Sequence, residues 1–203
     1  MMSVVELFDK GGILVYPLLI LLVWSLAIIA IKWFALRREN IIKPNAVEQV
    51  ESLLLANKVP EATAYCKQNP GPMTRILEAA IINHDKSEAD LKEILEEAGR
   101  QEVPKIRSQL TTLGTIASVA PLLGLLGTVL GMITVFSTLA QETTVNASAL
   151  AGGISEALIT TACGMAIAMP TLAFYNFFMN QVQNLIIEIE KVSLHMVAVL
   201  KRA

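Results

Sequence analysis

The sequence predicts an all-α membrane protein with three transmembrane helices, of which the second and third are long enough to extend into the cytoplasm. Hydrophobic residues make up 54% of the 203 residues, and the mean hydropathy is +0.55. The core of one soluble domain cannot absorb so much apolar surface. Three uncharged runs account for it, at residues 13–31, 110–141 and 157–187, and a bilayer crossing needs about 20 apolar residues.

The placement of Lys and Arg predicts the orientation. Lys10 is the only basic residue before the first run, eleven lie between 36 and 108, none lies in 141–150, and three follow the third run. Cytoplasmic segments of membrane proteins carry the excess of basic residues. We therefore expect the N-terminus outside, and both the segment 36–109 and the C-terminus inside.

These patterns divide the chain into seven predicted elements. They are an outer N-terminal helix (1–12), a first transmembrane helix (13–35), a cytoplasmic helical domain (36–109), a second transmembrane helix (110–139), an outer loop (140–151), a third transmembrane helix (152–178) and a cytoplasmic C-terminal helix (179–203).

The first run is predicted to be a retained anchor. It is too long for a signal peptide, lacks a small-x-small cleavage site, and is followed by Lys32, Arg37 and Arg38. We expect Lys32 to reach the inner headgroups with its long side chain. A functional role for Lys32 is the alternative.

The cytoplasmic segment reads as several short helices and one long one. Ser87, with Asp90 three residues on, predicts a capping box at the start of the long helix. Pro104 should kink or loosen this helix. We expect the helix to run on without a change of direction into the second transmembrane helix.

The second apolar run carries a face of small residues. Ala117, Ala120, Gly124, Gly127, Thr128, Gly131 and Thr138 share this face. Small residues let membrane helices approach closely, and Pro121 is tolerable because neighbours can satisfy the freed carbonyl. A phosphate loop is rejected for GLLGTVLG, because the Lys-Ser/Thr ending and a preceding strand are missing.

The third run has the same character and adds a carboxylate. Gly153, Ala157, Thr160, Thr161, Gly164, Ala168, Thr171 and Tyr175 fall on one side of a helix, with Leu158, Met165, Met169 and Leu172 opposite. An ionisable residue such as Glu156 within a membrane helix usually marks an ion pathway. The alternative is that Glu156 sits at the outer water interface.

Two segments resemble the MotA/TolQ/ExbB proton-channel family, most closely its ExbB/TolQ branch. APLLGLLGTVLGMITVF at 120–136 resembles the second-span signature, and GGISEALITTACGMAIAMPTLAFYN at 152–176 resembles the third. The three-span topology, the cytoplasmic insertion and the KGGILVYPLL opening are also similar to the family. A flagellar stator fits less well, because those chains usually have four spans.

The resemblance implies a homopentamer in the bacterial inner membrane, with a periplasmic N-terminus and a cytoplasmic C-terminus. It implies a dimer of an ExbD/TolR-like single-span protein in the central pore, whose aspartate carries the proton, and it suggests a TonB/TolA-like protein as a further partner. By motif, Thr128, Thr161 and Glu156 would line the ion route, and Pro170 would be the helix-breaking proline. Thr160, which stands where alanine is common, is included among the candidate ion-route residues, although the resemblance assigns its hydroxyl no role.

The function implied is coupling of proton-motive force to work across the envelope, with TonB-dependent outer-membrane transport as the leading process. TolQ-like envelope maintenance, a sodium-driven member and a non-conducting membrane scaffold stay open as alternatives. No cofactor or metal is expected besides the translocated ion, H⁺ or alternatively Na⁺. No enzyme signature and no nucleic-acid partner are expected, since Ser, His and acidic residues do not converge. Membrane lipids are the remaining partner.

Overall fold

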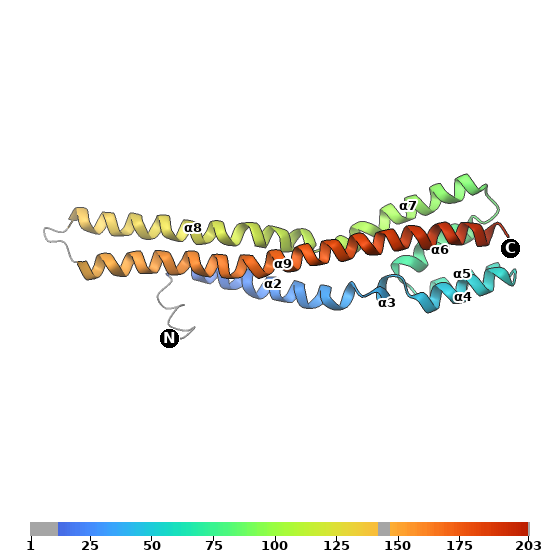
Figure 1. Ribbon diagram of the computed structural model, residues 1–203, viewed down its shortest axis with the longest axis horizontal. Helices are drawn as coiled ribbons and strands as arrows, with labels where there is room; N and C mark the ends of the chain where they lie inside the picture. Colours follow the sequence, from blue (N-terminus) through green and yellow to red (C-terminus); the bar gives the residue numbers. More distant parts are fainter. Residues whose placement is uncertain (1–11, 142–146, 203) are drawn as a thin grey trace. The chain divides into compact units, whose positions relative to one another are not determined.

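The computed structural model describes residues 12–141 and 147–202, and in these residues every regular element is a helix (Figure 1). The helices are α2 (Val15–Ala35), α3 (Arg38–Ile41), α4 (Pro44–Leu55), α5 (Val59–Gln68), α6 (Pro72–Ile82), α7 (Glu88–Arg107), α8 (Leu110–Gln141) and α9 (Ala147–Leu200). The predicted N-terminal helix lies, apart from Gly12, outside the described residues. Three described helices are long and apolar enough to cross a membrane, namely α2, α8 and α9. The predicted all-α class with three such helices is therefore confirmed.

The chain forms two compact units. The apolar unit comprises residues 1–30 and 109–176, and the polar unit comprises 31–108 and 177–203. The chain passes from one unit to the other at three places. Two of them lie inside the helices α2 and α9, and the third lies at 108–109, between α7 and α8.

Within the apolar unit, α8 and α9 lie side by side (Figure 1), and glycines set their close contact. A Cβ on Gly164 would lie 2.6 Å from the carbonyl oxygen of Ala120, and one on Gly127 would lie 2.5 Å from Cγ2 of Thr160. Gly124 and Gly131 face Thr161 and Ala157 in the same way. Any larger residue at these positions would push the two backbones apart.

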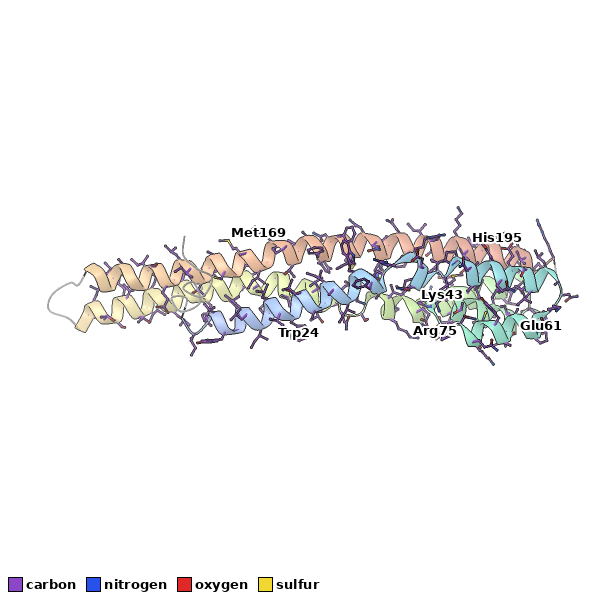
Figure 2. The ribbon with its side chains drawn as sticks, turned by 90° about the horizontal axis from the view of Figure 1, so that it is seen from below. Trp24, Lys43, Glu61, Arg75, Met169 and His195 are labelled. Carbon is purple, nitrogen blue, oxygen red and sulfur yellow. The ribbon has the colours of Figure 1, made fainter. Side chains whose placement is uncertain are left out.

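The predicted small face of α9 is the face that packs inside the apolar unit. All eight of its residues are buried or half-buried, whereas Leu158 and Met169 on the opposite side are 62% and 67% exposed. Trp24 on α2 is also exposed, and Figure 2 shows its side chain and that of Met169 at the surface. The helix period and the residue types were sufficient to predict this face.

Helix α2 joins the same contact through its own apolar residues. Leu18 is buried against Ala120 of α8 and against Ile167 and Ala168 of α9. Ser25 is buried as well and donates to the carbonyl of Leu22 in its own helix. Its hydroxyl is therefore satisfied without leaving the apolar surroundings.

Three prolines lie inside helices without ending them. Pro104 lies within α7, Pro121 within α8 and Pro170 within α9. The resemblance implied that Pro170 would break its helix, but α9 continues for thirty residues beyond it to Leu200. Each proline costs one backbone hydrogen bond, and packing on both sides retains the helix. The predicted third transmembrane and C-terminal segments thus form one helix, which begins at Ala147 rather than at 152.

Helices α7 and α8 are two separate helices, with Ser108 and Gln109 between them. Helix α7 ends at Arg107, and Ser108 is extended, with ψ 149°. Gln109 then adopts a left-handed conformation, with φ 64°, before α8 begins at Leu110. Residues other than glycine rarely adopt that backbone conformation. Neither Ser108 nor Gln109 is a Gly or Pro, so no residue type in the sequence signals the break.

The polar unit is built on the short helices α4 to α7. Their buried apolar core includes Val50, Leu54, Ala62, Met73, Ile76, Leu77, Ile81 and Leu91. The predicted capping box is confirmed at the start of α7: the backbone N–H of Asp90 donates to Ser87 Oγ, and the N–H of Ser87 donates to the Asp90 carboxylate.

A buried carboxylate ties α6 to α7. Glu102 is 4% exposed and accepts hydrogen bonds of 2.6 Å from both Arg75 and Lys105. Burial alone would raise the pKa of the Glu102 carboxyl, but these two cations outweigh it and the pKa is lowered. Glu102 therefore stays ionised in the folded chain at neutral pH.

Within the polar unit, the C-terminal part of α9 is joined to the other helices by an ion pair, further hydrogen bonds and an aromatic stack. Arg38 pairs with Glu188, and His195 Nε2 lies 2.9 Å from Glu51 Oε1 of α4. Lys201 donates to the carbonyls of His84 and Lys86, in the connection between α6 and α7. Trp33 also stacks on Phe177, with ring centroids 5.9 Å apart.

Candidate ion pathway

Thr161 joins α9 to α8 directly. Its hydroxyl donates to the carbonyl of Gly124 over 2.7 Å, which is possible because Gly124 has no side chain in the way. The carbonyl of Gly124 can still accept its helical hydrogen bond, since a carbonyl has two lone pairs. Thr161 is half-buried, so part of its surface remains available to a neighbour.

Thr128 does not bond to α9. It is half-buried, and its hydroxyl donates over 2.7 Å to the carbonyl of Leu125 in α8 itself. A threonine in this arrangement still has acceptor capacity on its oxygen. The structure therefore leaves Thr128 able to accept a hydrogen bond from water or from another chain.

Glu156 and Thr160 lie in a different place from Thr161. They line a cavity of about 370 Å³ bounded by the residues before α2, the middle of α8 and the first turns of α9. Thr160 is 2% exposed and donates to the backbone carbonyl of Glu156. Glu156 and Thr161 are five positions apart, which turns their side chains about 140° from each other around the helix.

Two further residues of this cavity were not predicted. Gly12 lies against the Glu156 carboxylate and has φ +66°, so a side chain there would be strained and would also overlap Glu156. Thr134 lines the α8 wall of the cavity. It lies seven residues after Gly127, hence on nearly the same face, and that spacing was the available signal.

Lys32 does not extend toward headgroups as expected. It is 5% exposed, and its ammonium donates to the carbonyl of Ile106 over 3.3 Å and reaches Ser108 Oγ at 3.5 Å. The expectation was wrong because α7 ends beside this part of α2 and supplies backbone oxygens. Hydropathy along α2 alone contains no information about α7.

Comparison with known proteins decides the family. The sequence model of the MotA/TolQ/ExbB proton channel family matches residues 68–191, which include α8 and both predicted ion-route segments. The chain belongs to the MotA/TolQ/ExbB family. The predicted resemblance to this family is thereby confirmed, and the names of its relatives support the ExbB branch.

Relatives within this family carry ExbB names. A Synechocystis protein named biopolymer transport protein ExbB-like 3 is 37% identical over 171 residues, which cover 83% of this chain and 81% of the relative. An ExbB homologue of Methanothermobacter thermautotrophicus is 28% identical over 95% of this chain and 67% of its own length. The biopolymer transport protein ExbB of Salmonella typhimurium is 43% identical over 70 residues, which cover 34% of this chain and 29% of the relative.

Proposed function

We propose that this chain is the ExbB/TolQ-like subunit of an ion-driven motor of the bacterial inner membrane. Five copies would surround two copies of an ExbD/TolR-like single-span partner, and the motor would couple proton-motive force to TonB-dependent outer-membrane transport. The observation that carries the proposal is the family match over residues 68–191, which covers α8, most of α9 and part of the polar unit. The ExbB names of its relatives favour this process over envelope maintenance.

The orientation in this proposal follows from charge. The described segment 31–108 holds twelve Lys and Arg residues, which favours a cytoplasmic location for the polar unit. The outer ends of α8 and α9 and the Glu156 cavity would then face the periplasm. Ions driven inward would meet the cavity first.

The scarcity of carboxylates in the membrane helices suggests why a partner chain is needed to carry the ion. Among the described residues of α2, of α8 and of α9 up to Asn176, Glu156 is the one Asp or Glu. A threonine can bind water or orient a carboxylate, but it does not titrate near neutral pH. A second acid near Thr128 and Thr161 would have to come from another chain. Each charge moved supplies about 2.3 kcal/mol per 100 mV, enough to bias a conformational step.

The test of this proposal is proton flux in liposomes containing the purified chain, with and without the small single-span protein encoded beside it. We expect little flux from the chain alone and strong flux from the complex. High flux through the chain alone would overturn the two-component mechanism. No flux through the assembled complex would favour the scaffold alternative.

Thr161→Val gives a residue-level prediction of the same mechanism. The substitution keeps the shape and removes a hydrogen bond between membrane helices, which is worth about 0.6 kcal/mol on average. We expect normal assembly by native mass spectrometry and loss of ion-coupled work. Thr171→Val is the matched control, because Thr171 is 2% exposed and donates only within α9, to Ile167. Equal loss in both variants would assign Thr161 to packing.

A sodium-driven motor is the second candidate, and the cavity is the observation that favours it. Glu156 and Thr160 together offer carboxylate and hydroxyl oxygens, which are ligands of hard cations. Replacing Na⁺ by K⁺ at constant membrane potential distinguishes the two ions. Flux that persists without Na⁺ would exclude the sodium-driven motor.

A further inference from the structure

We propose that Lys32 is a positioning residue that fixes the joint between α7 and α8. The joint consists of Ser108 and Gln109, the two residues between these helices. It is the crossing between the apolar and polar units at which the chain is not helical. The other two places where the chain passes from one unit to the other lie inside helices, α2 and α9.

The end of a helix leaves its last carbonyl groups without partners in that helix. In low-dielectric surroundings such oxygens need another donor. Lys32 supplies one to Ile106 and also reaches the hydroxyl of Ser108, the first residue of the joint. One buried ammonium thus contacts both sides of the point where α7 stops.

The other cations near this end of α7 are engaged elsewhere. Lys105 pairs with Glu102, and Arg107 reaches Gln183 of α9. Both side chains are exposed, whereas Lys32 is 5% exposed. The partial negative charge at a helix C-terminus favours a cation there, which helps to account for a lysine retained inside protein at this point.

The intrinsic conformational preference of glutamine does not account for the backbone conformation at the joint. Gln109 has φ 64°, in the left-handed region that glycine adopts freely and glutamine does not. The surrounding contacts must therefore maintain this conformation. Lys32, on another helix, reaches the joint directly through Ser108.

A firm joint matters if force passes between the two units. That second step rests on the proposed function, because it assumes that ion flow moves the membrane helices. A loose joint would let α8 move without α7. Loss of Lys32 should then leave ion flux and assembly in place while the coupled work fails.

The test of the joint is hydrogen–deuterium exchange on the full chain in lipid nanodiscs, comparing wild type with Lys32→Met. We expect the amides within 104–112, of which Pro104 itself has none, to exchange at least about tenfold faster, because a buried acceptor loses its donor. Lys32→Arg should restore slow exchange, since it keeps the charge and the donors. Lys191→Met, the same change at an exposed lysine of the polar unit, should leave these amides as they are.

Three outcomes would overturn the proposal: unchanged exchange at 104–112 in Lys32→Met, faster exchange throughout the chain, or no rescue by Lys32→Arg. If Lys32→Met does not fold, Ser108→Ala removes one contact without altering α2 and should loosen the same amides to a smaller degree. Unchanged exchange at 104–112 in Ser108→Ala would then overturn it.

The coupling step has a separate readout, in complexes formed with the partner. Flux retained with work lost in Lys32→Met supports the coupling role. Work retained in spite of a loosened joint overturns that role alone. Absence of flux in the wild-type complex would count against the proposed function and leave the role of Lys32 at the joint intact.

Discussion

Some glycines of this chain are required for close helix packing and others are not, and the atoms around each glycine show which it is. Gly164 faces the backbone of α8, where a Cβ would meet the Ala120 carbonyl oxygen at 2.6 Å and the Cα of Gly124 at 3.1 Å. Gly99, in the middle of α7, has nothing within 4 Å of an added Cβ. Gly164 is therefore required by helix packing, whereas Gly99 makes no such contact and only lowers the stability of α7.

We therefore expect a Gly→Ala substitution to change the free energy of unfolding in opposite directions at these two positions. Gly164→Ala should lower the free energy of unfolding by about 1–3 kcal/mol, because the obstructing atoms are backbone and cannot turn aside. Gly99→Ala should raise it by about 0.5–1 kcal/mol through helix propensity. Unfolding followed by circular dichroism in mixed micelles measures both. A loss of stability in both variants would mean that Gly99 faces a partner chain.

The Glu156 cavity yields a prediction about the ion route that leaves the carboxylate untouched. Thr134→Leu should fill the cavity and lower flux through the assembled complex by about tenfold or more, since a barrier higher by about 1.4 kcal/mol suffices. Ser137→Leu is the matched control: Ser137 is also exposed on α8 and bonds only to its own helix, but it does not line the cavity. Equal flux in the two variants would place the route elsewhere.

Among the helices, the pair α6 and α7 is held by an ion cluster around the buried carboxylate of Glu102, and the effect of this cluster depends on pH. The pKa of Glu102 is lowered in the folded chain from its ordinary value of 4.5. A lowered pKa means that Glu102 contributes stability above about pH 4.5, and that this contribution is lost as the pH falls through the folded pKa.

Glu102→Gln should therefore cost stability at neutral pH, and the difference from wild type should shrink below pH 4.5. Denaturant unfolding of both proteins at a series of pH values measures the difference. Glu97→Gln is the control, because Glu97 is exposed on the same helix. A difference that stays constant down to pH 3 would show that the charge of Glu102 contributes nothing.

The helices also show which features could be predicted from sequence. The capping box at Ser87 and the small face of α9 depend on neighbours within one or two turns, so local patterns predicted them. The break after Arg107 lies where Lys32, seventy-four residues away in sequence, donates to the carbonyl of Ile106, and no residue type at the joint signals the break. Pro170 did signal a break, but packing along α9 outweighed one lost hydrogen bond.

For the molecule as a whole, the residues named as the ion route do not form one site within a single chain. The family motif placed Glu156, Thr160 and Thr161 together in sequence. The structure places the first two at the cavity and the third at the contact with α8. A sequence motif gives the spacing of residues along a helix. What each side chain contacts depends on the helices packed around it, and the motif does not contain that information.

The continuity of α9 through both units gives the last prediction. Asn176 is the final residue of the apolar unit on this helix and is exposed. Asn176→Pro removes a backbone hydrogen bond and kinks a helix interior, at a cost of about 3 kcal/mol. If α9 transmits movement between the units, the proline variant should assemble and conduct ions but should fail to power transport.

Asn176→Ala is the control for Asn176→Pro, since it removes the same side chain and keeps the helix. The measurements are native mass spectrometry of the complex, proton flux in liposomes, and energy-dependent uptake in cells carrying each variant. Full uptake with Asn176→Pro would show that α9 need not be straight or stiff at the boundary. Movement would then have to pass through α2 or through the joint that Lys32 holds. If the joint carries the movement, Lys32→Met should lose uptake with or without Asn176→Pro, and uptake retained in the double variant would assign the movement to α2.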